Sequence, residues 1–320
     1  MTSKILILGA TGGIGYAVTQ NLINRGIPVA ILVRNREKAL RLFDHSSLLT
    51  IHEGDVQDVG LLNTISYDKD FIFHGVNYPY TDWFGNIDTA TEKIIHAASL
   101  NNARIVYPGS VYNFGIARIP IDETTIPRPN SRKGALRVRM EEIMESAVLD
   151  GKCKVLIVRL PDFWGPNVVN HGTVPIFENA LKKKPMHYIG RKDVRHQFVY
   201  TKDAADIITT LMLTAEKLQT FEVINYGGET FETASDFLYK IAQCANSPKE
   251  VRVLNRFVIT TLALFMPAMR EVKEMLYLFE NAIILDDSKV KEWFPHFTPT
   301  PLNTAINETL QWFAQYRLNK

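Results

Sequence analysis

Short apolar runs alternate with longer amphipathic segments along the first half of the chain. The runs are rich in aliphatic and β-branched residues, and a further one follows later: Lys4 to Leu8, Pro28 to Val33, Leu49 to Glu53, Phe71 to Phe73, Arg104 to Tyr107, Lys154 to Arg159 and Phe221 to Tyr226. Continuous runs of this kind are typical of strands covered on both faces. Helical patterns lie between them, including Tyr16 to Asn24 and a segment that begins near Arg36. The alternation predicts an α/β fold with a doubly wound parallel sheet.

The pattern changes after Arg159, where prolines and glycines interrupt the chain and strands become sparse. We therefore predict a sheet domain over residues 1–164 and a smaller, mostly C-terminal lobe over 165–197 and 244–320. Residues 198–243 are expected to return to the sheet domain as helix, strand and helix. Within the lobe, Arg270 to Glu280 has the pattern of one amphipathic helix, and Asp287 or Ser288 is expected to cap a helix after it.

The first apolar run leads directly into a glycine-rich turn, Gly9-Ala10-Thr11-Gly12-Gly13-Ile14-Gly15. In a Rossmann fold, Gly9 would make the tight turn, Gly12 would let the backbone approach a pyrophosphate, and Gly15 would let the helix pack closely on the sheet. The amides and positive dipole of the helix start then face the phosphates. An ordinary glycine-rich turn is the alternative, but the strand before it and the helix after it favour a dinucleotide site. The predicted contacts are Gly9, Thr11, Gly12, Gly13, Ile14 and Gly15.

The end of the second strand bears on the choice of dinucleotide. Arg34 stands where an acidic residue that binds the ribose hydroxyls of NAD is expected. A guanidinium there can pair with the 2′-phosphate of NADP, and Lys38 adds positive charge, although Glu37 offsets part of it. A solvated strand end is the other interpretation of Arg34. The sequence favours NADP, with NAD as the less favoured cofactor. Further cofactor contacts are expected at strand ends and on a later helix, namely Asp55, Val56, Gly75, Lys133 and Pro161.

Further segments carry a resemblance to a known family. Arg159-Leu160-Pro161-Asp162-Phe163-Trp164-Gly165-Pro166 resembles the turn R-x-x-N-x-Y-G-P of the extended short-chain dehydrogenases/reductases, the epimerase and dehydratase group. The segment from Arg195 to Ala205 is similar to R-D-F-V-x-V-x-D-x-A of the same family, and Gly109-Ser110-Val111-Tyr112 resembles its S-x-V-Y-G strand end. The resemblance implies a Rossmann fold and an oxidoreductase or epimerase that exchanges hydride with a nicotinamide at a carbonyl or hydroxyl carbon. The chain is similar to the atypical members, because it departs from the family in its catalytic pair.

The family's catalytic pair is a tyrosine and a lysine in Y-x-x-x-K, one helical turn apart. Alignment on Glu141 places Lys133 at the tyrosine and Arg137 at the lysine. Lys133, desolvated beside Arg137, can itself donate a proton. Alternatively, Ser110 or Tyr112 relays the proton. In a third interpretation Lys133 and Arg137 only bind ribose and phosphates, and the protein is a non-catalytic NADP-binding sensor.

The residues that contact substrate in the family also differ here. Asp162 replaces an asparagine, and His196 stands at an arginine position with Arg195 beside it. A carboxylate close to a diphosphate would be repelled, which disfavours nucleotide sugars. Apolar and aromatic residues follow the strand ends or lie in the lobe (Tyr78, Tyr80, Trp83, Phe163, Trp164 and 257–266), which suits a smaller or more hydrophobic carbonyl compound. The predicted substrate contacts are Tyr78, Asp162, Phe163, Arg195 and His196.

Composition narrows the partners of the chain. Its 320 residues carry a net charge of only +2, which suggests neither nucleic acid nor an anionic membrane as a partner. Cys153 and Cys244 lack the spacing of metal ligands, so no metal site is expected, and free thiols are typical of a reducing compartment. With no N-terminal leader pattern, we expect a cytoplasmic protein with a small-molecule substrate. The family resemblance implies a possible homodimer.

Overall fold

The computed structural model describes residues 4–318, and the contacts of the chain divide it into two compact units. The first unit contains residues up to Ser110 together with Leu136–Arg159 and Ala204–Ile224. The second contains Val111–Ala135, Leu160–Asp203 and the residues from Asn225 onward. Of the segment 198–243 that the sequence assigns to the sheet domain, only residues 204–224 belong to the first unit.

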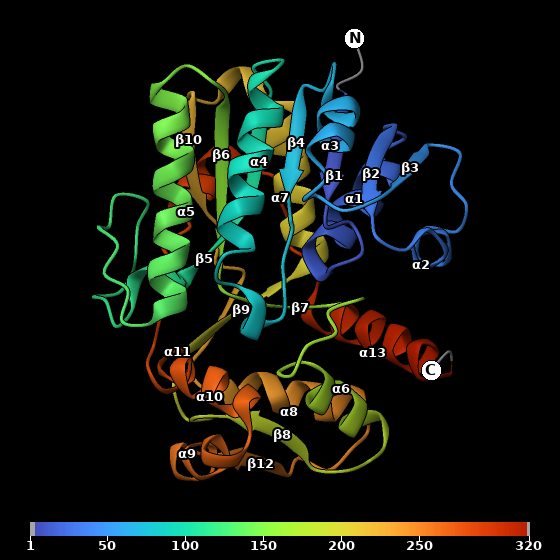
Figure 1. The fold of residues 1–320 in the computed structure, drawn as a ribbon. Helices are drawn as coiled ribbons and strands as arrows, with labels where there is room; N and C mark the ends of the chain where they lie inside the picture. Colours follow the sequence, from blue (N-terminus) through green and yellow to red (C-terminus); the bar gives the residue numbers. More distant parts are fainter. Residues whose placement is uncertain (1–3, 319–320) are drawn as a thin grey trace. The chain divides into compact units, whose positions relative to one another are not determined.

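A seven-stranded sheet in the order β10-β6-β5-β4-β1-β2-β3 forms the centre of the first unit (Figure 1). Its strands are β1 (Ile5–Leu8), β2 (Val29–Val33), β3 (Leu49–Glu53), β4 (Phe71–His74), β5 (Arg104–Ser110), β6 (Lys154–Leu160) and β10 (Phe221–Asn225). β1 pairs in parallel with both β2 and β4, and every residue of β1 is buried. The prediction of a doubly wound Rossmann-type α/β fold is confirmed.

Helices cover both faces of this sheet. They are α1 (Gly13–Asn24), α2 (Arg36–Leu42), α3 (Val59–Ser66), α4 (Ile87–Ser99), α5 (Arg132–Leu149) and α7 (Thr201–Leu213), with short 3-10 helices η1 (Tyr80–Asp82) and η3 (Ala215–Lys217). Figure 1 shows α4 and α5 on the near face of the sheet, with α7 behind it. The Asp206 carboxylate of α7 accepts hydrogen bonds from Asn21 at 3.1 Å and Arg25 at 2.6 Å, which fixes the end of α1.

The second unit is built around two small sheets. One has the order β11-β9-β7, from β7 (Asp162–Trp164), β9 (His196–Tyr200) and β11 (Glu229–Phe231), and the other pairs β8 (Met186–Ile189) with β12 (Val251–Leu254). The remaining elements are η2 (Val111–Phe114), α6 (Val174–Leu181), α8 (Ala234–Cys244), α9 (Arg256–Phe265), α10 (Pro267–Glu274), α11 (Tyr277–Glu280), α12 (Ser288–Trp293) and α13 (Leu302–Leu318). Stacked aromatic rings form its core, including Trp164, Phe177, Phe198, Phe237 and Phe313.

The prediction of one helix over Arg270 to Glu280 is wrong, because α10 ends at Glu274 and α11 begins at Tyr277. Residues 275–278 are all buried, and four consecutive residues cannot all lie on the buried face of a straight surface helix. The chain therefore turns between the two helices. Asp287 occupies the N-cap position of α12, but its carboxylate pairs with Lys291 at 2.7 Å and not with a backbone amide.

Candidate functional site

The turn between β1 and α1 admits only glycine at two positions. Gly9 has a φ of +83°, and a Cβ there would lie 2.2 Å from the carbonyl oxygen of Gly75. A Cβ on Gly15 would lie 2.2 Å from the carbonyl oxygen of Gly9. The Gly12 amide donates to that same oxygen at 3.0 Å, which closes the turn. The turn has the shape that lets backbone approach a bound group closely.

The positive end of the α1 dipole is not neutralised by a capping side chain. Gly12 is the N-cap and supplies no capping side chain, and the described first turn holds no acidic residue. Because the first amides of a helix lack intrahelical acceptors, they and the dipole favour an anion here. Gly12 is exposed, Thr11 and Gly13 are half-buried, and Ile14 packs into the core. The residues present therefore fit a dinucleotide phosphate.

Positive side chains gather after β2. Arg34 and Lys38 are both exposed, whereas the Arg36 guanidinium donates to the Ile51 carbonyl at 2.8 Å. After β3, the Asp55 carboxylate accepts from the Gln57 amide at 2.9 Å, which shapes the turn, and Val56 is buried. Arg34 and Lys38 thus remain exposed at the end of β2.

Arg137 lies among aromatic side chains of the first unit. Its guanidinium stands 4.5 Å from the centre of the Trp83 ring and donates to the Tyr107 hydroxyl. Burial raises the pKa of Tyr107, and the charge of Arg137 only partly opposes this shift. The sequence pattern does not reveal these partners, since Trp83 and Tyr107 come from other parts of the chain.

His74, at the end of β4, is buried close to Arg137. Its Nε2 lies 3.0 Å from the Thr91 hydroxyl, which itself donates to the Ile87 carbonyl, so Nε2 carries the proton and donates to Thr91. Burial, with a contribution from the charge of Arg137, lowers the pKa of His74 to about 3. The imidazole is therefore neutral at physiological pH.

Lys133 lies in the first turn of α5, within the second unit, and its side chain is fully buried. Its ammonium pairs with Glu271 and, at 2.7 Å, with Glu274, both of α10. The Lys133 backbone amide also donates to Glu274 at 3.0 Å. Desolvation opposes ionisation of Glu274, but the hydrogen bonds from Lys133 outweigh it and hold the pKa of Glu274 below its ordinary value. α10 and α5 are thus joined by a cation between two carboxylates.

The two hydroxyl residues at the end of β5 are partly accessible. Ser110 ends β5 in the first unit and Tyr112 lies in η2 of the second, and both are half-buried. The Tyr112 carbonyl accepts from the Tyr277 hydroxyl at 3.3 Å. It would also lie 2.5 Å from a Cβ on Gly134. The backbone of η2 therefore lies directly against the start of α5.

The structure brings Asp162 and His196 together. The His196 Nε2 lies 2.9 Å from an Asp162 carboxylate oxygen, and its ring is stacked near Phe279 at 6.2 Å. Asp162 remains half-buried, while His196 is buried. The hydroxyl of Tyr188 belongs to the same region, since burial and then the Asp162 charge raise its pKa.

The structure gives each of the other predicted substrate contacts its own surroundings. Arg195 is exposed and faces Glu232 at 3.5 Å. Tyr78 accepts from the Gln57 side chain at 3.0 Å in the first unit. Phe163, which follows Asp162 in the sequence, is 37% exposed. Of the expected apolar lining, Trp83 is buried, whereas Phe257 and Phe265 are each 79% exposed on α9 and therefore line no enclosed space.

Over residues 4–318, no cluster of His, Cys, Asp or Glu side chains could hold a metal ion. In the same range, no helix has the length and apolar character needed to cross a bilayer. Cys153 is buried and Cys244 half-buried, and neither forms a disulfide.

The sequence model of the NAD dependent epimerase/dehydratase family matches residues 5–227, which is more than half of the chain. The protein belongs to this family. Membership supports a nicotinamide dinucleotide as its cofactor and agrees with the glycine turn on α1.

Several relatives of this epimerase/dehydratase family member match most of its length. The uncharacterized protein YLL056C of Saccharomyces cerevisiae is 26% identical over 77% of this chain and 81% of its own. The UDP-N-acetyl-alpha-D-glucosaminuronate decarboxylase of Bacillus cytotoxicus is 23% identical over 98% of this chain and 99% of its own. The fold is similar to that of the Bordetella bronchiseptica enzyme WbmH, solved in complex with NAD+, with a TM-score of 0.75, 20% identity and coverage of 98% of this chain and 99% of that one.

The glycine turn agrees with the family pattern, whereas the alignment on Glu141 predicts that Lys133 and Arg137 stand in place of the catalytic pair. That alignment assigns the tyrosine position to Lys133, which is paired with Glu271 and Glu274, and the lysine position to Arg137, which contacts Trp83 and Tyr107. The alignment that assigns these two positions is a prediction from the sequence. It gives no sign of their partners, because Glu271 and Glu274 follow Lys133 by more than a hundred residues.

Proposed function

We propose that this protein is an NADP-dependent oxidoreductase acting on a carbonyl or hydroxyl group of a small molecule. The observation that carries the proposal is the glycine turn on an uncapped α1, followed by exposed Arg34 after β2. When bound, the nicotinamide supplies or accepts the hydride. The chain's residues then hold the phosphates, orient the substrate and move one proton to or from its oxygen.

Arg34 is proposed to select the phosphorylated cofactor by pairing with the 2′-phosphate. Arg34→Ala should weaken NADPH binding by about tenfold or more, since a charged pair is lost, and leave NADH binding nearly unchanged. Arg41→Ala is the matched control, because Arg41 is an exposed cation of α2. Titration of both cofactors by nicotinamide fluorescence measures the effect. Tighter binding of NADH than of NADPH by the unaltered protein would contradict this assignment.

The proton is proposed to pass through a hydroxyl at the end of β5, Ser110 or Tyr112, with Lys133 in a positioning role. Lys133 is already bound by two carboxylates, which stabilise the ammonium and oppose proton release. In reduction, the substrate carbon receives hydride and its oxygen receives the hydroxyl proton, which solvent then replaces. Ser110→Ala and Tyr112→Phe each remove one hydroxyl with little change in shape. One of them should lower kcat by about a hundredfold with cofactor affinity retained.

The substrate is proposed to bear hydroxyl groups and to lack a nucleotide diphosphate. Asp162 and His196 stand where the family has an asparagine and an arginine, and they pair with each other. A half-buried carboxylate can accept hydrogen bonds from substrate hydroxyls, whereas no guanidinium is present at the arginine position to hold a diphosphate. NADPH consumption should therefore be seen with hydroxyketones, aldehydes or free sugars and not with UDP-glucose or dTDP-sugars. Turnover of the nucleotide sugars alone would refute this part.

A non-catalytic NADP-binding sensor is the second candidate. It is favoured by one observation, that both positions of the catalytic pair are engaged in contacts within the protein. The same substrate panel separates the two functions. A sensor would bind NADPH and consume none of it with any substrate, and Ser110→Ala and Tyr112→Phe would change nothing.

We also propose a cytoplasmic location, on the basis of the two free thiols, and a homodimer formed through α4 and α5. The dimer rests on the family resemblance. Light scattering after gel filtration measures the mass directly, and a value of 36.4 kDa at all concentrations would exclude the dimer.

A further inference from the structure

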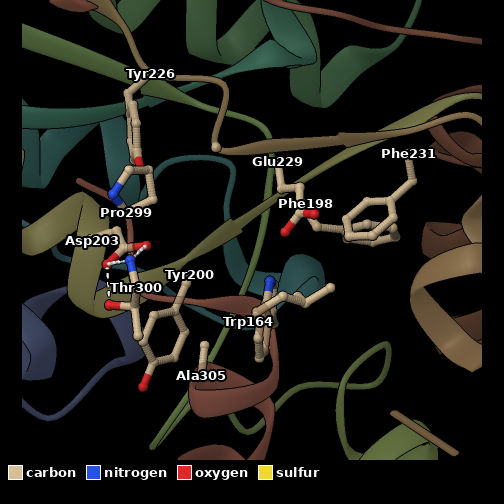
Figure 2. A pocket seen from close by; sticks show the side chains of 12 residues that line it. Trp164, Phe198, Tyr200, Asp203, Tyr226, Glu229, Phe231, Pro299, Thr300 and Ala305 are labelled. Carbon is tan, nitrogen blue, oxygen red and sulfur yellow. Dashed lines mark hydrogen bonds between the residues drawn. The ribbon is translucent and has the colours of Figure 1, made fainter. Parts of the chain in front are cut away.

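A cavity of about 190 Å³ lies within the second unit, and of the residues expected above near cofactor or substrate only Trp164 is among those that line it. Five of the twelve residues that line it are buried aromatic residues, and Figure 2 shows their side chains around the open space: Trp164, Phe198, Tyr200, Tyr226 and Phe231. The Trp164 and Tyr200 rings are 5.0 Å apart, and the Phe198 and Phe231 rings 6.0 Å apart. They come from β7, β9 and β11 and from the residue after β10, so the rigid sheet positions the cavity wall.

Two carboxylates give the cavity a negative character. Figure 2 shows the Glu229 side chain reaching from its strand into the space above Trp164 and beside Phe198. Burial raises the pKa of Glu229 above its ordinary value, and the charge of Lys240 only partly opposes this shift. Asp203 lies at the other side, where it accepts from the Thr300 hydroxyl at 2.6 Å and from the Thr300 amide. Glu229 nevertheless remains exposed to solvent, so its charge is only partly desolvated, and a cation in the cavity would stabilise that charge.

Lys202, in the first turn of α7, is paired with a carboxylate. Lys202 pairs with Glu308 at 2.5 Å, and Glu308 also accepts from the Tyr200 hydroxyl at 2.6 Å. This arrangement holds the Tyr200 ring at the cavity wall while its hydroxyl is bonded to Glu308. The hydroxyl of Tyr200 is thus engaged by Glu308, while its ring lines the cavity.

We propose that this cavity binds a small organic cation of the quaternary or tertiary ammonium class. Aromatic faces attract a diffuse positive charge, and cages of aromatic rings are a known way to recognise quaternary ammonium groups. A hard metal ion would need several oxygen ligands, and the oxygens of Asp203 are already engaged by Thr300. A neutral apolar ligand would gain from the rings but would gain nothing from the Glu229 charge. The organic cation satisfies both the rings and the carboxylate.

The test compares choline with 3,3-dimethyl-1-butanol, which has the same shape without the charge. We expect choline to bind the full-length protein at least about tenfold more tightly than the alcohol, as measured by titration calorimetry. Glu229→Gln should weaken choline binding by about tenfold and leave the alcohol unaffected. Equal affinities for the two probes, or no heat of binding with choline, would overturn the proposal.

Two further variants assign the binding to this cavity. Glu232→Gln removes a carboxylate that faces Arg195 outside the cavity, and it should leave choline affinity unchanged. Trp164→Phe keeps a ring in the core and should weaken choline binding several-fold, with the loss of one ligand-sensitive indole signal by NMR. An equal loss of affinity in Glu232→Gln and Glu229→Gln would show a general effect of charge and would refute the site. NADPH titration of the same variants checks that the fold and the cofactor site persist.

Discussion

Lys133 carries a charge at a position that solvent does not reach. Its ammonium is compensated by Glu271 and Glu274, which are only 28% and 22% exposed. Removing one partner from such a buried cluster leaves charges without compensation, which costs more than the cluster itself contributes. The burial of Lys133 between two carboxylates therefore predicts that its replacement lowers the free energy of unfolding.

Lys133→Met should lower the free energy of unfolding by about 3 kcal/mol, because both carboxylates lose their cation. Urea unfolding measures this change. Lys152→Met is the matched control, since Lys152 pairs with Asp150 at an exposed site and should change little. The triple variant Lys133→Met/Glu271→Gln/Glu274→Gln should regain part of the loss. If Lys133→Met is as stable as the unaltered protein, the ion pairs of Lys133 with Glu271 and Glu274 do not stabilise the fold.

His74 makes stability depend on pH. Its pKa is about 3 in the folded protein, below the ordinary value of 6.5, because of burial and the charge of Arg137. Between these two values the unfolded chain binds a proton that the folded protein does not. The contribution is therefore fully present above pH 6.5 and is lost as the pH falls towards 3.

Replacing His74 by Gln should make the free energy of unfolding less dependent on pH in this window, by at most about 1.4 kcal/mol per pH unit. Glutamine keeps an Nε2 donor for Thr91 and does not titrate. Urea unfolding at pH 7 and pH 5 gives the two values for each protein. His96→Gln, on the surface of α4, should retain the original dependence. An unchanged slope in His74→Gln would show that other groups dominate acid unfolding.

At the level of elements, the β1–α1 turn is the part of the site that sequence determines most fully. The glycine spacing predicts the turn, and the structure supplies the reason in the two carbonyl oxygens, of Gly75 and Gly9, that a side chain would strike. By contrast, the partners of Lys133 and Arg137 depend on which helix packs where. Local sequence patterns do not show which residues will pair with Lys133 and Arg137, because acidic residues on the surfaces of different helices have the same local pattern.

Gly15→Ala should destabilise the protein by about 1–3 kcal/mol, since its Cβ would overlap the Gly9 carbonyl. Gly12→Ala is the matched variant, because its Cβ would stand 3.4 Å from the same oxygen, an ordinary contact. It should fold normally and weaken cofactor binding by blocking the approach of the phosphates. Thermal unfolding and NADPH titration together distinguish the two effects. Equal stability of both variants would contradict the assigned close packing of Gly15.

The N-terminus of α8 offers a test of local stability in the second unit. Thr233 and Asp236 form a capping box in which each side chain accepts from the other's backbone amide. Thr233→Ala should cost about 1 kcal/mol of unfolding free energy, and Thr233→Ser should cost little because it keeps the hydroxyl. Denaturant unfolding of the pair measures the contribution. A larger loss in the serine variant would contradict it.

For the whole molecule, the sequence predicts the large sheet well and the second unit poorly. Strands of the large sheet such as β1 and β2 are continuous apolar runs, whereas β7 and β11 are short and partly exposed and lack such a signal. The return of 204–224 to the first unit follows from the α7 and β10 patterns. The assignment of 111–135 and 225–243 to the second unit depends on tertiary contacts, such as Asn225 donating to the Ile121 carbonyl at 3.0 Å.

Because each unit is assembled from separated chain segments, a single cut should not release a folded unit. A fragment of residues 1–203 lacks most of α7 and all of β10. It also lacks Thr220, whose carbonyl accepts from the Val155 amide at 2.7 Å, and Gln219, whose carbonyl accepts from buried Arg104. We expect this fragment to show no cooperative thermal transition by circular dichroism, while the full chain does. A sharp transition in the fragment would show that the first unit folds without its last segment.

The burial of Lys133 also gives the protein a built-in chemical reporter. An amine-reactive reagent modifies accessible lysines such as Lys38 and Lys152 and is kept from Lys133 for as long as α10 covers it. Acylation of Lys133, followed over time by mass spectrometry of its peptide, therefore counts the openings of α10 from α5. Any ligand that holds this helix in place would slow that reaction, whether or not the ligand is chemically changed.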